Sequence, residues 1–182
     1  MSGDRLRKLF GVGPLGAALS LLLLAVALLV DHRLGRPAIL SYRSFMRGLG
    51  VVLVLAGLVL HFRTMYALRT WWVEGRLCTT GPFRWFRHPM YAAWITFVCL
   101  GVALYLDSWV LIAWAAALHP LWRVLVTSEE KMMARRFPDE YPPYAARTGR
   151  FIPRPYVPVE RPLCTLSRRL YETHRGGTED HR

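Results

Sequence analysis

Long apolar runs alternate with short polar segments as far as Val126, and polar residues dominate the rest of the chain. A helix of about 20 residues, rising roughly 1.5 Å per residue, covers the hydrocarbon core of a bilayer. Four runs approach or reach this length: residues 12–30, 46–66, 90–106 and 109–126. The pattern therefore predicts an all-α fold, a polytopic membrane helix bundle with about four transmembrane helices.

The breaks between the runs predict how the helices meet. Asp107 and Ser108 are the only polar residues between the third and fourth runs, so these two runs are expected to form a tight helical hairpin. The second run contains Gly48, Gly50 and Gly57, small residues that let another helix approach closely.

The first run also has features of a secretory signal peptide. Arg5, Arg7 and Lys8 precede it, and the small residues Ala25 and Ala27 resemble a cleavage site. However, further apolar residues follow this position, and the run is longer than the apolar part of a typical signal peptide. An uncleaved membrane span is the preferred interpretation.

Charge and composition narrow the class of partner. The chain is 53% hydrophobic, yet it carries a net charge of +12 from 24 Lys and Arg against 12 Asp and Glu. The apolar content excludes a disordered basic tail, and three cysteines are too few for a disulfide scaffold. Because the arginines lie beside apolar runs, the expected partner is the lipid bilayer with its anionic head groups, and not nucleic acid.

The arginines also predict an orientation. The segment from Arg63 to Arg87 carries five arginines, and more follow Val126, whereas the turn at Asp107 has no cation. By the positive-inside rule, this segment and the C-terminal part face the cytoplasm. One group of arginines conflicts with the rule, because four spans place their connection outside: Arg33, Arg36, Arg43 and Arg47.

The last third of the chain is polar and rich in proline. We expect a short helix near Glu129–Phe137, then an extended proline-rich segment, and a surface helix at Leu163–Thr173. Residues 1–160 are interpreted as a single membrane domain, and residues 161–182 as a cytoplasmic tail that is partly disordered.

The hairpin predicts a polar site at the cytoplasmic interface. His88 lies just before the third run, and Glu129 and Glu130 lie just after the fourth. Because the two runs have similar lengths and share a tight turn, these residues are expected at one depth, together with Arg87 and Tyr91. Such a group can bind a zwitterionic ligand or can simply anchor the hairpin at the interface.

A polar stripe on the fourth run leads to the same place. His119, Arg123, Thr127 and Glu130 share one face of a helix, and charged side chains within a span usually face a bundle interior or a cavity. Two other interpretations remain open: Arg123 extends its charge to the interface, and His119 is a structural residue beside Pro120. The sequence has no metal-ligand spacing, no phosphate loop and no Gly-rich dinucleotide motif.

One stretch resembles a known family. The string Leu77-Cys-Thr-Thr-Gly-Pro-Phe-Arg-Trp-Phe-Arg-His-Pro-Met-Tyr91 resembles the cofactor-binding motif of isoprenylcysteine carboxyl methyltransferases, and it is similar to that of the wider group of membrane phospholipid methyltransferases. The later residues Glu129, Glu130, Phe137, Tyr141, Tyr144 and Arg150-Phe-Ile-Pro153 agree in order and spacing. The family usually has Gly where this chain has Ala93.

The resemblance implies an integral membrane enzyme that uses S-adenosylmethionine. The pocket wall it implies consists of Leu77, Cys78 and Phe83. The main cofactor contacts it implies are His88, Pro89, Met90 and Tyr91, with Glu129 and Glu130 as the acidic partners. Arg123 is the nearest match to the arginine that contacts the acceptor in the family, so it is the candidate catalytic residue.

Several acceptors and two other functions stay open. A lipophilic or small acceptor with a carboxylate, amine or thiol group fits the chemistry, and the short chain suggests a bacterial inner membrane with the active site facing the cytoplasm. The alternatives are a nicotinamide-dependent membrane reductase and a non-enzymatic membrane subunit or small transporter.

Overall fold

The structure is a computed structural model, and it describes residues 12–36, 39, 43–72 and 77–154. Within these ranges the chain is helical, with no β-strand and one isolated β-bridge. The elements are α2 (Gly13–Arg33), α3 (Arg43–Trp72), the 3₁₀ helix η1 (Gly81–Arg84), α4 (Pro89–Ala92), the π-helix η2 (Ala93–Val98), α5 (Cys99–Tyr105), α6 (Trp109–Arg136) and α7 (Tyr141–Arg147). The all-α prediction is therefore confirmed.

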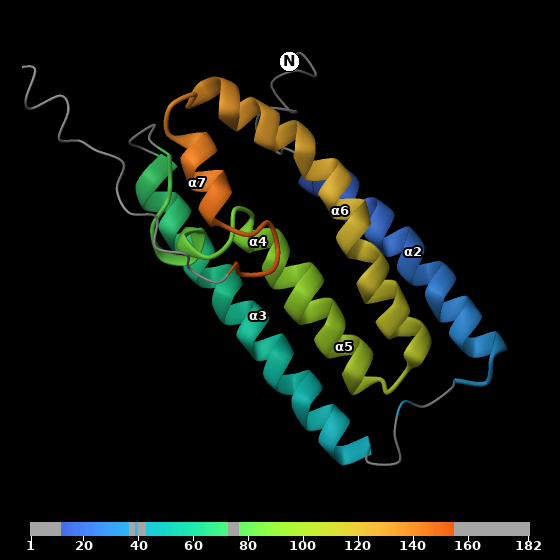
Figure 1. The fold of residues 1–182 in the computed structure, drawn as a ribbon. Coiled ribbons are helices and arrows are strands. Elements are labelled where there is room, and N and C mark those ends of the chain that lie inside the picture. The colour runs from blue at the N-terminus through green and yellow to red at the C-terminus, as the bar shows by residue number, and fades with distance from the viewer. Residues whose placement is uncertain (1–11, 37–38, 40–42, 73–76, 155–182) are drawn as a thin grey trace, which may run out of the picture.

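The long helices lie side by side in the order α3, α5, α6, α2 (Figure 1). The elements α4, η2 and α5 follow one another without a break and form one helical rod. α2 packs mainly on α6, not on α3, which follows it in the chain. The α5–α6 hairpin therefore lies between α2 and α3 in the bundle (Figure 1).

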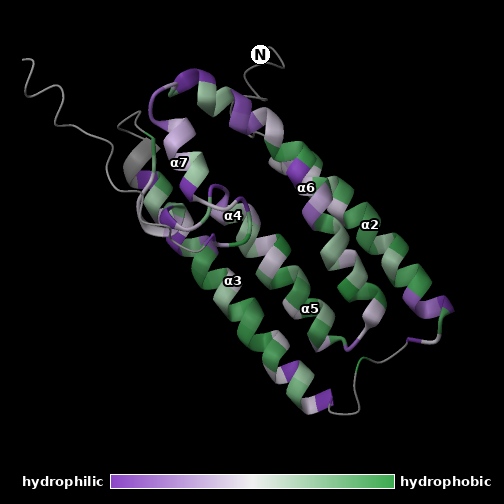
Figure 2. Cartoon of the chain, in the orientation of Figure 1, coloured by the Kyte–Doolittle hydropathy of each residue, from purple (hydrophilic) through white to green (hydrophobic). Residues whose placement is uncertain are grey.

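Among the described residues, three helices are long and apolar enough to cross a membrane: α2, residues 43–69 of α3, and α6. The third predicted run, residues 90–106, forms a shorter apolar helix, Pro89–Tyr105, with η2 in its middle. Apolar residues cover most of the long helices, and hydrophilic residues gather at their ends (Figure 2). Only 11% of the most apolar window of α2 and 17% of that of α3 is buried, so both helices present apolar faces outward, as lipid contact requires.

Glycines allow α3 to pack closely on the rod of α4, η2 and α5. A Cβ atom on Gly50 would lie 2.5 Å from the carbonyl oxygen of Gly101, and one on Gly57 would lie 2.8 Å from that of Ala93. The prediction of close helix approach is thus confirmed at Gly50 and Gly57. Gly48 has open space around its Cβ position and plays no such part.

The C-terminal part differs from the sequence prediction. The predicted short helix near Glu129–Phe137 is not separate, because α6 continues through it to Arg136. The predicted extended segment contains α7, in which Pro142 and Pro143 occupy the first turn, where a missing N–H costs no hydrogen bond. The predicted helix at Leu163–Thr173 and the tail from 161 lie outside the described residues.

A polar cluster lies at the end of the molecule opposite α7. The hydroxyl of Ser108 donates to the carboxylate of Asp31, and Asp107 accepts a hydrogen bond from the backbone N–H of Ile39 at 3.0 Å. Arg43 Nε lies 3.5 Å from Asp107 Oδ2. Asp107 has a φ of 55°, a left-handed conformation that aspartate tolerates in a tight turn. These contacts hold the predicted hairpin turn.

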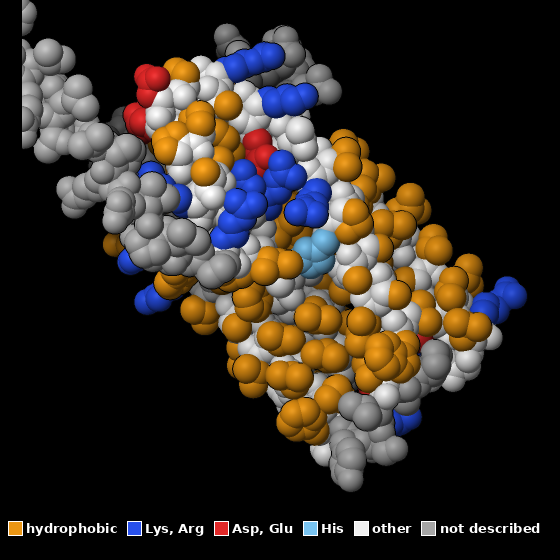
Figure 3. Space-filling view, viewed as in Figure 1, with side chains coloured by type: hydrophobic (Ala, Val, Ile, Leu, Met, Phe, Trp, Pro, Cys, Tyr) orange, Lys and Arg blue, Asp and Glu red, His pale blue; other side chains and the backbone are white. Residues whose placement is uncertain are grey.

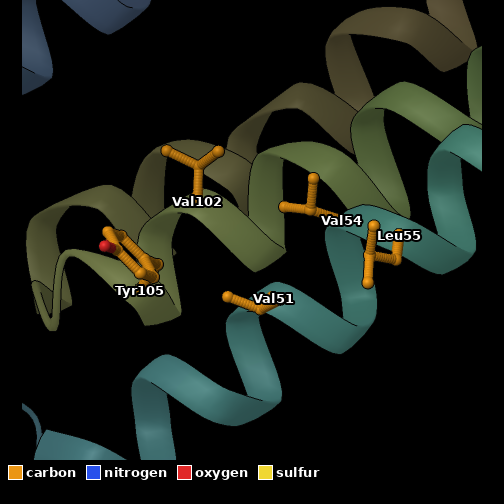
Figure 4. A pocket seen from close by; sticks show the side chains of 5 residues that line it. All are labelled: Val51, Val54, Leu55, Val102 and Tyr105. Carbon is orange, nitrogen blue, oxygen red and sulfur yellow. The ribbon is translucent and has the colours of Figure 1, made fainter.

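An apolar groove of about 250 Å³ lies between α3 and α5. It is lined by Val51, Val54, Leu55, Val102 and Tyr105 (Figure 4). Apart from the Tyr105 hydroxyl the lining is aliphatic and it carries no charged side chain, and the groove lies toward the Asp107 end of the rod.

Candidate functional site

His88 lies between two carboxylates at the α7 end of the bundle. It is the residue before α4, and its Nδ1 atom lies 3.6 Å from Glu129 Oε2, while its Nε2 atom lies 3.5 Å from Glu130 Oε1. Both glutamates are on the last turns of α6. The hairpin thus returns these residues to one place, and the proximity predicted from the sequence is confirmed.

Glu130 is the more enclosed of the two glutamates. The Nε atom of Arg150 donates to both of its carboxylate oxygens at 3.0 Å, and Arg87 Nη1 lies 3.4 Å from Oε1. The glutamate side chain is 10% exposed. Its ion pair with Arg150 raises the pKa of that guanidinium above its ordinary value. Glu130 is therefore held by three basic groups and joins α6 to two other segments.

Glu129 has different partners and keeps one oxygen less engaged. Its Oε1 atom accepts a hydrogen bond from the hydroxyl of Tyr91 at 3.0 Å and another from the backbone N–H of Val12 at 2.9 Å. Both hydrogen bonds go to the same oxygen, so Oε2, beside His88, retains acceptor capacity for a cationic group. The two neighbouring glutamates therefore differ in their surroundings: Glu130 joins three segments, and Glu129 keeps its Oε2 atom beside His88.

The segment after α7 reaches the site by pairing with the loop before α4. Phe86 and Gly149 form a parallel β-bridge, in which Arg87 N–H donates to the carbonyl of Gly149 at 2.7 Å. The next N–H, that of His88, donates to the carbonyl of Arg150 at 3.2 Å. This pairing places Arg150 beside Glu130.

α7 supports the same loop from its other side. The hydroxyl of Tyr144 donates to the carbonyl oxygens of Phe83 and Phe86 at 2.9 and 3.3 Å, and the ring packs with Leu77 and Tyr141 in a small apolar cluster. Burial raises the pKa of Tyr144, so the hydroxyl stays protonated and able to donate.

The three residues predicted as pocket wall lie around this α7 support. Leu77 and Cys78 are buried and Phe83 is half-buried. Burial is the main cause that raises the pKa of the Cys78 thiol. The described contacts of these residues are with the α7 side and not with the two glutamates, so their contact with a cofactor stays a prediction.

The remaining predicted cofactor residues form the start of the α4 rod. Pro89 is buried at its first position, and Met90 is half-buried. Tyr91 stacks on His88, with ring centroids 5.8 Å apart and an interplanar angle of 19°. Proline suits this first position because its fixed φ is already helical.

The predicted stripe on α6 touches the C-terminal segment at two points. His119 lies against Phe151, with ring centroids 6.2 Å apart, and Glu130 binds Arg150. Arg123 lies between them on the same helix, and it is exposed. Thr127 donates its hydroxyl to the backbone carbonyl of Arg123. The structure thus brings the ends of the stripe to the site and leaves the Arg123 side chain at the surface.

Basic side chains gather on the face where α6, α7 and the C-terminal segment meet. Figure 3 shows a cluster of Lys and Arg side chains around a small acidic patch, next to a histidine and above a broad hydrophobic surface. Charge and apolar surface therefore meet at this site, as expected where a membrane interface crosses the protein.

Two partners of this site were missed in the sequence analysis. Trp122 packs on Tyr91 with ring centroids 4.5 Å apart, and its spacing from Glu129, two helical turns, was the available signal. The backbone N–H of Val12 gave no signal, because an N–H is present in almost every residue. Within the described ranges, no three His, Cys, Asp or Glu residues are grouped so that they could hold a metal ion.

Comparisons with known proteins agree with the membrane methyltransferase resemblance. The phospholipid methyltransferase family matches residues 45–140, more than half of the chain. The nickel-cobalt-cadmium resistance protein NccN of Alcaligenes xylosoxydans xylosoxydans is 36% identical over 89 residues. The match covers 46% of this chain and 40% of NccN, so this chain spans well under half the length of that relative. No solved structure matches the chain.

Proposed function

The chain belongs to the phospholipid methyltransferase family, and on that premise we propose that it transfers a methyl group from S-adenosylmethionine to a lipophilic or small acceptor at the cytoplasmic face of the membrane. The observation that carries the proposal is His88 between Glu129 and Glu130, within 3.6 Å of both. A charged and hydrogen-bonding cluster at the end of an apolar bundle suits a zwitterionic ligand.

The residues present fit the amino-acid end of the cofactor. That end carries one ammonium and one carboxylate group. Glu129 Oε2 is the acceptor available to the ammonium. One buried donor atom, Arg87 Nε, has no hydrogen-bond partner within the described residues, and His88 Nε2 has only its 3.5 Å contact with Glu130 Oε1. Buried donors without partners are costly, and a ligand carboxylate would supply the missing acceptor. The rings of Tyr91 and Trp122 pack on each other beside this end, with centroids 4.5 Å apart.

The bound cofactor would supply a methyl group on an already activated leaving group. The protein's own contribution is then mainly to hold and orient the two reactants. His88 and Glu129 hold the polar end, and the apolar rings exclude water. A carboxylate or thiolate acceptor needs no general base, whereas an amine must lose its proton before it attacks. The class of acceptor therefore decides whether one of these residues also moves a proton.

The acceptor side is proposed to lie at Arg123. This residue is exposed on α6, between His119 and Glu130 along the helix. A lipophilic acceptor can enter from the bilayer at this point, while the water-soluble cofactor enters from the cytoplasm. The arginine charge can then orient an anionic or polar head group.

Calorimetric titration with S-adenosylhomocysteine tests the cofactor site. We expect Glu129→Gln and His88→Ala each to weaken binding by about 10- to 150-fold, since a hydrogen bond to a charged group is worth about 1.5–3 kcal/mol. Because Glu129 is partly exposed, the effect should lie toward the lower end of this range. Equal binding by wild type and both variants would place the cofactor elsewhere.

Orientation is tested by cysteine labelling with an impermeant reagent in a variant without the native cysteines. New cysteines at Thr79 and Ser128 should be protected in intact cells, and one at Asp107 should be labelled. Strong labelling at position 79 or 128 from outside would contradict a cytoplasmic site.

A further inference from the structure

We infer that Trp122 is a positioning residue of the cofactor site and that helix α2 holds it in place through Ser20. The inference rests on the proposed cofactor site at His88 and Glu129. It adds α2 to that site, although α2 lies outside residues 45–140, the part of the chain that the family covers.

The contacts form a continuous path from α2 to Glu129. The indole N–H of Trp122 donates to the Ser20 hydroxyl at 3.0 Å, and that hydroxyl donates to the carbonyl of Gly16 at 2.7 Å. The indole ring then packs on Tyr91 at 4.5 Å, and the Tyr91 hydroxyl donates to Glu129 at 3.0 Å. The position of Tyr91 therefore depends on a hydrogen bond made by α2.

The indole ring of Trp122 is tightly enclosed by its neighbours. Trp122 is 6% exposed, and a Cβ atom on Gly16 would lie 2.5 Å from its ring. The ring is therefore pressed against the backbone of α2, where no larger residue fits. With the N–H bound to Ser20, the indole can neither rotate nor move away from Tyr91.

α2 also touches the far end of the path. The backbone N–H of Val12 donates to the same oxygen of Glu129 that Tyr91 uses. A Cβ atom on Gly13 would lie 3.6 Å from the Tyr91 hydroxyl oxygen, an ordinary van der Waals distance. The start of α2 thus directs Oε1 away from the ligand side and leaves Oε2 beside His88.

Trp114 is a control that separates an effect on the position of Tyr91 from an effect on the stability of the fold. Trp114 is also on α6, is 8% exposed, and donates its indole N–H to the same residue of α2, at the backbone carbonyl of Ser20. It lies two helical turns, about 12 Å, further from Glu129 than Trp122 does. Trp114→Phe and Trp122→Phe therefore remove the same type of hydrogen bond between the same two helices.

The experiment measures thermal unfolding and S-adenosylhomocysteine affinity in detergent for wild type, Trp122→Phe, Trp114→Phe and Ser20→Ala. Both tryptophan variants should lower the unfolding temperature. Trp122→Phe and Ser20→Ala should weaken binding by about 2- to 10-fold, the range expected for one aromatic contact, and Trp114→Phe should leave it unchanged. Once Trp122→Phe has removed the N–H, adding Ser20→Ala should weaken binding little further.

Three results would overturn the inference. If wild type binds the ligand and Trp122→Phe and Trp114→Phe bind equally well, Trp122 only stabilises the fold. If Ser20→Ala and Trp122→Phe act additively on affinity, the two residues do not act through one contact. Should Trp122→Phe fail to fold, the comparison of Ser20→Ala with Trp114→Phe decides the matter. Failure of wild type itself to bind the ligand would reject the proposed cofactor site and the inference together.

Discussion

Arg150 binds Glu130 through two of its nitrogens: Nε lies 3.0 Å from both carboxylate oxygens and Nη2 lies 2.5 Å from Oε2, and this pair joins the C-terminal segment to α6. Arg150→Ala would leave Glu130 with Arg87 and His88 as its basic neighbours. We expect it to lower the free energy of unfolding by about 1–3 kcal/mol, the cost of losing a hydrogen bond to a charged group in a partly buried place. Thermal or denaturant unfolding in detergent measures the change.

Arg150→Lys is the matched control for this pair. Lysine keeps the charge but cannot reproduce the planar arrangement of guanidinium donors. It should therefore recover only part of the lost stability. Full recovery by lysine would mean that charge alone, and not the hydrogen-bond geometry, holds the segment.

The contact between α3 and α5 predicts that substitutions at two nearby glycines, Gly48 and Gly50, differ in their effect on stability. Gly50→Val should be strongly destabilising, because its new atoms would meet the backbone of Gly101 and Tyr105, which cannot move aside cheaply. Gly48→Val should be nearly neutral, because nothing lies within 4 Å of its Cβ position. Comparison of the two unfolding temperatures checks the packing, and equal effects would contradict it.

Cys78 should react slowly with alkylating reagents at neutral pH. Burial raises the pKa of its thiol, so the reactive thiolate is scarce, and the residue is only 9% exposed. The alkylation rate should rise by about tenfold per pH unit through neutral and mildly alkaline pH, as thiolate forms. Mass spectrometry of a Cys99→Ser, Cys164→Ser variant measures this rate, and the same protein unfolded in detergent should react as an ordinary thiol.

Arg123→Leu should impair methyl transfer more than cofactor binding, if the acceptor lies at this side chain. The arginine is exposed on α6 and is expected to orient the acceptor, while the cofactor contacts lie at His88 and Glu129. Turnover with a membrane lipid extract and S-adenosylhomocysteine affinity should be measured together. Arg135→Leu, an exposed substitution in the last turn of α6, is the control. Unchanged turnover in Arg123→Leu would assign this arginine to the interface alone.

The helices themselves could be predicted from the sequence, but their order could not. Apolar runs of suitable length mark α2, α3 and α6, and the polar pair Asp107 and Ser108 marks the hairpin. Hydropathy is the same whichever neighbour a helix has, so the packing of α2 on α6 gave no signal. The helix α7 was missed because Pro142 and Pro143 usually indicate irregular structure, although both fit the first turn of a helix.

The proximity of His88 to the two glutamates could be predicted from the hairpin, whereas the contacts that support these residues could not. Two apolar runs of similar length necessarily return Glu129 and Glu130 to the level of His88. The partner of Glu130 is Arg150, which reaches it only through the β-bridge between Phe86 and Gly149. Such a contact depends on how α7 folds back, and the local pattern of residues does not encode it.

The packing of α2 on α6 has a consequence for the order of events during synthesis of the chain. Ser20 meets Trp122 across 102 residues of sequence, which a ribosome adds in roughly 5–20 s. During this interval α2 must stay in the bilayer without its final neighbour, with lipid covering the face that later receives Trp122. Helix insertion and helix association are therefore separate events in this protein. The Glu129 site becomes complete only when α6 docks on a helix that entered the membrane long before it.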